Sequence, residues 1–186
     1  MRNTTLSVAR HLFSLALVLP FLTAGGCGYY STSATGGTNL KSIAVPLFAN
    51  QTLEHGLEET VTRAVVDAFV ADNHLAVVAE PEAESILWGT IVDYRRIPFS
   101  FDAQGTVTEY KLEIVTRVEY EDRKSTKTLW SDDDLSAWAT YTLDPSAIAA
   151  SDATQTEEAS TSEDGARETA VDKLARELVA KTVGGW

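Results

Sequence analysis

Side chains that commonly carry chemistry are sparse in this sequence. Of its three histidines, His55 and His74 lie beyond the first 26 residues, and neither has a cysteine or carboxylate at the spacing of a zinc or catalytic site. The run Asp132 to Asp134 could gather calcium, but it lacks the alternating ligands and closing Glu of an EF-hand loop. No phosphate-binding glycine loop, nucleophile elbow or paired-carboxylate motif is present. We therefore expect a protein that is not an enzyme and uses no metal or cofactor.

The single cysteine, Cys27, is the one residue with a recognisable chemistry. It follows an early positively charged segment, an apolar run and the small residues that a signal peptidase needs. Residues 24–26, Ala-Gly-Gly, resemble the lipobox at which bacterial lipoproteins are cleaved and acylated. We expect residues 1–26 to be a lipoprotein signal peptide and residues 27–40 to be a tether lipidated at Cys27. Several acyl chains, at about 0.8 kcal/mol per buried methylene, make such an anchor stable.

Charge and length restrict what the rest of the chain can do. The full sequence has a formal charge of −12, and loss of Arg2 and Arg10 with the signal peptide would leave −14. Nucleic acid is excluded as a partner, because binding it needs concentrated Lys and Arg. No second apolar run is long enough to span a bilayer, so we expect lipid to be the only membrane anchor. The remaining length suits one domain, residues 41–186.

Hydrophobic periodicity predicts the elements of this domain. Apolar stripes at helical spacing predict one helix from Thr52 to Asp72, with Thr52 as its N-cap, and another from about Glu163 to Thr182. Alternating or short apolar patterns predict strands at 41–48, 75–79, 86–96, 109–120 and 127–141. The first strand–helix–strand unit implies parallel pairing, and two later strands form an antiparallel hairpin. The fold class is an α+β two-layer sandwich, with two helices packed on one face of a mixed four- or five-stranded sheet.

Four features interrupt these patterns. Ile97 to Thr108 is turn-like and joins the two strands of the hairpin. The acidic run at 132–134 predicts a bulge or a break in its strand. Gly89 is costly in a strand unless something packs close, which places it beneath a helix. Residues 142–162 are polar and alanine-rich, and we expect a long mobile loop there.

Two helices cover only one face of this sheet, which leaves the other face for a partner. Alternation along the strand at 86–96 places Trp88, Val92 and Tyr94 together on the uncovered face, so we predict a partner interface there. The alternative is that the tryptophans of the sheet, Trp88 among them, belong to the core.

A second candidate surface lies at the hairpin. Arg95 and Arg96 are close in sequence to Phe99 and Phe101, and together they combine cations with aromatic rings. An amphiphile with phosphate head groups and acyl chains could dock on such a surface. The alternative is a basic strand end with two aromatic side chains that close the core.

Several short motifs, taken in their order along the chain, resemble those of a known protein family. The motifs are Cys27-Gly28-Tyr29, Ile43-Ala44-Val45-Pro46, Leu87-Trp88-Gly89-Thr90-Ile91, Tyr110-Lys111-Leu112 and a C-terminal helix that ends near Trp186. In this order they resemble the LptE family of lipopolysaccharide-assembly lipoproteins, whose members plug the outer-membrane barrel LptD. The resemblance implies an outer-membrane lipoprotein on the periplasmic side. Its partners would be an LptD-like barrel and lipopolysaccharide, with Arg95, Arg96, Phe99 and Phe101 as the lipopolysaccharide contact.

A different function is compatible with part of the same evidence. The segment from Ile43 to Thr52 also resembles outer-membrane lipoproteins that activate peptidoglycan synthases. Those lipoproteins reach inward through the cell wall, usually on a long disordered tether, whereas the predicted tether here has about a dozen residues. An activator of a peptidoglycan synthase is therefore the alternative function.

Overall fold

The computed structural model describes residues 40–142, 159–160 and 162–184. These residues lie in one compact unit, residues 36–186. The predicted signal peptide, nearly all of the predicted tether and most of the predicted loop at 142–162 lie outside the described residues.

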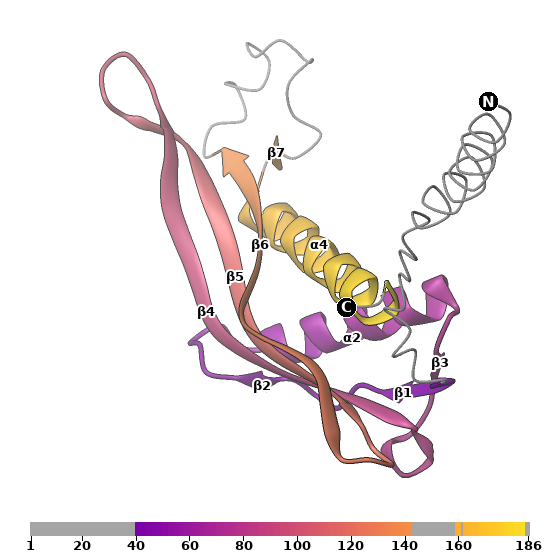
Figure 1. Cartoon of the computed structure of the whole chain (residues 1–186). Helices are drawn as coiled ribbons and strands as arrows, with labels where there is room; N and C mark the ends of the chain where they lie inside the picture. Colours follow the sequence, from indigo (N-terminus) through magenta and orange to yellow (C-terminus); the bar gives the residue numbers. More distant parts are fainter. Residues whose placement is uncertain (1–39, 143–158, 161, 185–186) are drawn as a thin grey trace, which may run out of the picture. The chain divides into compact units, whose positions relative to one another are not determined.

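A mixed sheet forms one layer of this unit (Figure 1). Its strands are β1 (Ser42–Ala44), β2 (Ala49–Asn50), β3 (Ala76–Val77), β4 (Ser85–Phe101), β5 (Val107–Asp122), β6 (Lys127–Thr142) and β7 (Ala159–Ser160). The strand order is β3-β1-β4-β5-β6-β7, and β2 pairs with β4 beyond β1. The pairs β1–β3, β1–β4, β2–β4 and β6–β7 are parallel, whereas β4–β5 and β5–β6 are antiparallel.

Two α-helices form the second layer. Helix α2 (Leu57–Asp72) and helix α4 (Glu163–Val183) pack against each other and against the sheet (Figure 1). A short 3-10 helix, η2 (Glu80–Glu82), precedes β4. This arrangement confirms the predicted α+β fold class, with more strands than expected. The predicted strand at 41–48 is shortened to β1, and β2 follows it outside the predicted range. Strand β7 lies within the region predicted to be a loop.

The core lies between the helices and one face of the long strands. The apolar stripe predicted for the C-terminal helix is buried throughout: Ala166, Ala170, Val171, Leu174, Ala175, Leu178 and Val179. Alternate residues of β5 and β6, such as Leu112, Ile114 and Ala139, face these helices and are fully buried. Each large apolar side chain buried here contributes about 1.5–3 kcal/mol to stability. We call this the helix face of the sheet and the opposite side the outer face.

Helix α2 begins five residues later than predicted. Gly56 adopts a left-handed conformation with φ of 76°, which ends any helical path through the preceding residues. Thr52 caps a turn instead of a helix, because its Oγ1 accepts a hydrogen bond from the Glu54 amide at 3.2 Å. Leu53, predicted to belong to the helix stripe, is 94% exposed.

The β4–β5 hairpin is longer than the sequence pattern indicated. Strand pairing continues to Phe101 and Val107, so the turn contains only residues 102–106. Asp102 closes it, since its Oδ1 accepts hydrogen bonds from the amides of Gln104 at 2.9 Å and Thr106 at 2.8 Å. Gly105 supplies the positive φ of 81° that the turn requires.

The acidic run on β6 forms a bulge, one of the two outcomes predicted for it. Thr116 and Val118 of β5 face Leu135 and Asp132 of β6, so β6 holds one extra residue there. The bulge is tied to α4, because the Lys181 ammonium lies 2.8 Å from Asp132 Oδ2 and holds the pKa of that carboxyl below its ordinary value.

Candidate functional site

A bulge in β4 separates the three residues predicted to form a partner interface. Ile91 pairs with Thr116 and Asp93 pairs with Val115, so Val92 is an extra residue and the alternation reverses after it. Trp88 remains on the outer face, 41% exposed, between the buried Leu87 and the half-buried Gly89. The predicted grouping of Trp88, Val92 and Tyr94 on one surface is therefore wrong.

Tyr94 belongs to the helix face. Its side chain packs against the core, and its hydroxyl donates a hydrogen bond to Glu163 Oε1 at 3.3 Å, at the first residue of α4. Burial, together with the Glu163 carboxylate, raises the pKa of Tyr94 to about 12. Tyr94 thus positions the start of α4 and is not part of an open surface.

The two adjacent arginines also point to opposite faces. Arg96 donates through Nε to Glu163 Oε1 at 2.6 Å and through Nη2 to Glu54 Oε1 at 2.7 Å, both on the helix side. The hydrogen bond to Glu163 raises the pKa of Arg96. Arg95, on the outer face, lies 3.1 Å from Glu113 Oε2. The predicted quartet of Arg95, Arg96, Phe99 and Phe101 is corrected accordingly, because Arg96 is committed to structural ion pairs.

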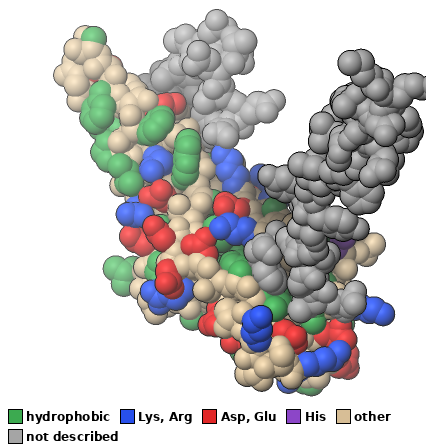
Figure 2. Space-filling model, in the orientation of Figure 1, with side chains coloured by type: hydrophobic (Ala, Val, Ile, Leu, Met, Phe, Trp, Pro, Cys, Tyr) green, Lys and Arg blue, Asp and Glu red, His purple; other side chains and the backbone are tan. Residues whose placement is uncertain are grey.

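An aromatic and cationic surface does exist on the outer face, near the end of the hairpin. The rings of Phe99 and Trp138 are 6.1 Å apart, and the Trp138 ring lies 5.8 Å from Lys111 Nζ and 5.3 Å from Lys173 Nζ. These distances are typical of aromatic and cation–π contacts. We call this surface the distal patch and define it as Arg95, Ile97, Phe99, Lys111, Trp138 and Lys173. Figure 2 shows hydrophobic side chains gathered along the β4–β5 hairpin, next to charged ones.

Sequence reasoning missed four members of the distal patch: Ile97, Lys111, Trp138 and Lys173. Lys111 and Trp138 lie on different strands, and only the pairing of Glu113 with Trp138 brings them together. Lys173 comes from α4 and donates a hydrogen bond to the Trp138 carbonyl at 3.3 Å. The alternation in β5 placed Lys111 on the solvated side, but the β5–β6 register could not be read from the sequence.

A hollow also lies on the outer face, toward the end of the sheet away from the distal patch. It has a volume of about 220 Å³, and its lining comes from Trp88, Thr90, Arg117, Val118, Glu119, Ser131 and Asp133. Trp88 Nε1 donates to Glu121 Oε2 at 3.2 Å, and Arg117 Nε donates to Asp133 Oδ1 at 3.0 Å. We call it the proximal pocket. It combines one exposed indole with polar groups from three strands.

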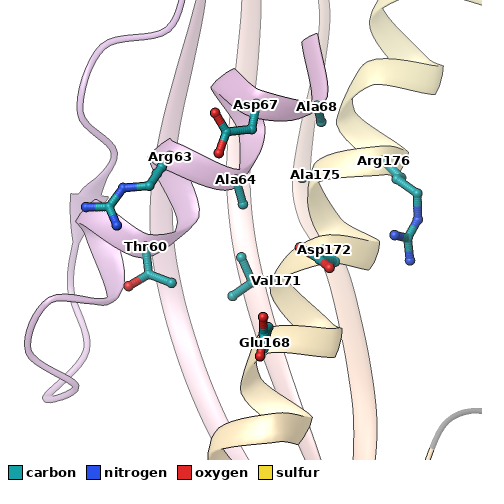
Figure 3. Close-up of a pocket in the computed structure, with 10 residues that line it drawn as sticks. All are labelled: Thr60, Arg63, Ala64, Asp67, Ala68, Glu168, Val171, Asp172, Ala175 and Arg176. Carbon is teal, nitrogen blue, oxygen red and sulfur yellow. The ribbon is translucent and has the colours of Figure 1, made fainter. Parts of the chain in front are cut away.

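A groove of about 380 Å³ separates α2 from α4 (Figure 3). Its floor is Ala64, Ala68, Val171 and Ala175, and charged side chains from both helices line it. Arg63 and Arg176 point away from the groove in opposite directions, so its polar groups do not converge on one point. The arrangement offers no catalytic constellation.

Neither described histidine forms a reactive site. His74 Nδ1 lies 2.8 Å from Asp72 Oδ2 on the surface, and His55 is exposed. Within residues 40–142, 159–160 and 162–184, no group of three or more His, Cys, Asp or Glu side chains could hold a metal ion. None of the helices in these ranges is long and apolar enough to cross a membrane.

These features define a class: a two-layer α+β domain whose long strands present an aromatic and charged outer face that neither α-helix covers. The chain belongs to the LptE lipopolysaccharide-assembly family, whose family model matches residues 40–182. This membership confirms the resemblance seen in the sequence. The family description names assembly and not catalysis, in agreement with the expectation of a non-enzyme. No curated protein matches the sequence.

A solved structure with a TM-score above 0.5 shows the same fold at low sequence identity. The hypothetical protein CT253 from Chlamydia trachomatis is 11% identical, with a TM-score of 0.52 over 78% of this chain and 97% of that chain. A minor lipoprotein from Acinetobacter baumannii is 14% identical, with a TM-score of 0.49 over 78% of this chain and 94% of that chain. At such identities the comparison concerns the fold alone.

Proposed function

We propose that this chain is an outer-membrane lipoprotein, anchored through Cys27 on the periplasmic side, that forms a plug complex with an LptD-like barrel. In this complex it assists lipopolysaccharide transport and assembly at the outer membrane. Membership of the LptE family over residues 40–182 is the observation that carries the proposal. The cysteine and the small residues that precede it support the anchor.

The shape of the β4–β5 hairpin supports the barrel contact. It extends beyond the helices at one end of the sheet, and Phe101, near its tip, is 59% exposed (Figure 1). Trp88 and Phe99 are also exposed on strand β4. Aromatic side chains contribute a large share of interface energies, so an exposed row of this kind suits burial by a partner.

The distal patch supports a contact with lipopolysaccharide. Lys111, which lies 3.2 Å from Glu113 Oε1, and Lys173 place two cations beside Trp138 that a phosphate group could contact. Ile97 and Phe99 offer apolar surface to acyl chains. The patch supplies local positive charge on a chain of formal charge −12. Lys111 and Lys173 replace Arg96 in this proposal.

Site-specific crosslinking in the native host tests the plug complex. A photocrosslinking residue at Trp88 or Phe101 is expected to trap a heat-modifiable outer-membrane barrel. The same residue at Glu168, on the groove side of α4, is the control and should trap the barrel less often. Capture of a peptidoglycan synthase would favour the alternative function. Capture of neither protein from any position would refute the plug complex.

A further inference from the structure

The proximal pocket differs in chemistry from the distal patch on the same face. We propose that it is a saccharide subsite that binds a single neutral or amino-bearing sugar ring. This inference deepens the proposed function and rests on it for the identity of the saccharide, which would be the sugar portion of lipopolysaccharide. Four features of the pocket support this proposal: the ring of Trp88, the polar side chains around it, the local charge and the volume.

Trp88 supplies a fixed platform. Its indole is 41% exposed on the outer face, and the hydrogen bond from Nε1 to Glu121 Oε2 at 3.2 Å restrains its orientation. The face of an aromatic ring carries partial negative charge. The C–H bonds on the apolar side of a sugar ring carry partial positive charge, so the two surfaces are complementary.

The rim of the pocket suits hydroxyl groups. Arg117 provides donors, and the carboxylates of Glu119 and Asp133 provide acceptors. Thr90 and Ser131 lie on two other lining positions, and their hydroxyls can both donate and accept. A sugar hydroxyl also donates and accepts, so groups from β4, β5 and β6 can engage adjacent hydroxyls of one ring.

The charge and polarity of the proximal pocket argue against the binding of a phosphate group or an acyl chain there. Arg117, the one cation that lines the pocket, is already paired with Asp133 at 3.0 Å, and Glu119 and Glu121 add negative charge nearby. A phosphate group would therefore be repelled. Most of the lining side chains are polar, so burying an acyl chain there would leave polar groups without partners.

The size of the pocket indicates one ring. Its volume of about 220 Å³ is below the range of roughly 300–1,000 Å³ that is usual for pockets that enclose larger ligands.

Ser131 of the pocket and Trp138 of the distal patch lie on the same strand and face, and at about 3.3 Å per residue they are roughly 20 Å apart. An extended glycolipid could therefore place its phosphates and acyl chains on the distal patch and a sugar in the proximal pocket.

Binding of a lipid-free oligosaccharide tests the subsite. The probe is the core oligosaccharide released from lipopolysaccharide by mild acid, added to the full-length lipoprotein in detergent micelles. Saturation-transfer NMR should detect binding to the wild type. Trp88→Ala should weaken that binding roughly tenfold, because it removes the platform. Trp88→Phe, which keeps a ring, should retain most of it, and Glu168→Ala, on the groove side of α4, should leave it unchanged.

The outcomes separate this subsite from the plug complex. Absence of transfer to the wild type, or equal binding by Trp88→Ala, overturns the subsite, whatever barrel crosslinking shows. Oligosaccharide binding that depends on Trp88 supports the subsite even if no barrel is captured. Circular dichroism of Trp88→Ala provides the folding check, and Arg117→Ala gives a second variant that should weaken binding if Trp88→Ala fails to fold.

Discussion

The ring of Phe48 packs so closely on Gly89 that a Cβ atom at position 89 would lie 2.1 Å from Phe48 Cε1. Phe48 is 2% exposed, and its amide donates to Thr62 Oγ1 of α2 at 3.0 Å, which fixes the segment between β1 and β2 beneath the helix. The sequence placed Gly89 beneath a helix. The group that approaches is this phenyl ring.

Gly89→Ala should therefore destabilise the protein. Forcing a methyl group into this contact should cost about 1–3 kcal/mol of the free energy of unfolding, as overpacking commonly does. Chemical denaturation of the full-length protein measures the change. The same substitution in a Phe48→Leu background should cost less, because the smaller side chain leaves room. Equal costs in the two backgrounds would show that the ring does not restrict position 89.

The two faces of α2 give a second prediction. Val61 is fully buried and Arg63 is exposed on the groove side, so the two positions differ in environment but lie on the same helix. Val61→Asp should place an unpaired charge in the core and cost at least about 3 kcal/mol, whereas Arg63→Asp should cost little. Thermal melts of the full-length variants decide the matter. Equal melting temperatures would contradict the observed helix face.

The β4 bulge shows what could and could not be predicted from the sequence. Alternation identified β4 and β5 correctly, because side-chain burial has a period of two in any strand. It could not reveal the extra residue at Val92, which reverses the faces of the residues from Asp93 to Pro98. That single shift moved Tyr94 and Arg96 to the helix face.

The pairing register of β5 and β6 could not be predicted from the sequence either. Trp138 and Lys111 meet only through the β5–β6 pairing, and no local pattern specifies that pairing. The helices were more predictable, because their apolar stripes are local and long. Even there, the start of α2 depends on Gly56 and on the turn at Thr52, and a period-based argument treats both as helix.

Tyr94 gives a prediction about pH. Burial and the Glu163 carboxylate raise its pKa from an ordinary value of 10.0 to about 12, because both disfavour the phenolate in the folded state. The stability that this shift contributes is fully present below pH 10 and is lost as the pH rises toward 12. Phenolate absorbance of the wild type minus that of Tyr94→Phe should show a transition near pH 12. Glu163→Gln should lower this midpoint but leave it above 10, because burial remains; a wild-type transition at pH 10 would contradict the buried position.

The proposed anchor gives a prediction about covalent chemistry. Cys27→Ser should abolish acylation and stop normal processing, because the hydroxyl is not a substrate for the thioether-forming step that a lipobox implies. Intact-mass measurement of the protein from membranes tests this. A mature wild-type protein that begins at Cys27 and carries the added mass of acyl chains is the expected result. An unmodified amino terminus at another residue would refute the lipoprotein proposal.

The final prediction distinguishes the distal patch from the arginine beside it. Arg96 bridges Glu54 and Glu163 on the helix face, whereas Lys111 and Trp138 lie on the outer face. Arg96→Ala should therefore lower the melting temperature with little effect on lipid binding, because it removes ion pairs that tie β4 to α4. Lys111→Ala and Trp138→Ala should weaken lipid binding with little effect on the melting temperature, since each removes part of the surface offered to phosphate and acyl chains.

Capture of lipid A by the immobilised full-length protein measures the effect of each substitution on lipid binding. Each single substitution in the distal patch should weaken capture by roughly 3- to 30-fold, the range expected for losing one cation–π or charge-assisted contact of about 0.7–2 kcal/mol. The effect of Lys111→Ala should shrink at high salt, because its contribution is electrostatic and partly exposed, while that of Trp138→Ala should persist. If Arg96→Ala weakens capture more than either of them at unchanged stability, the ligand binds on the helix face, and the division of β4 by its bulge does not determine where lipid is bound.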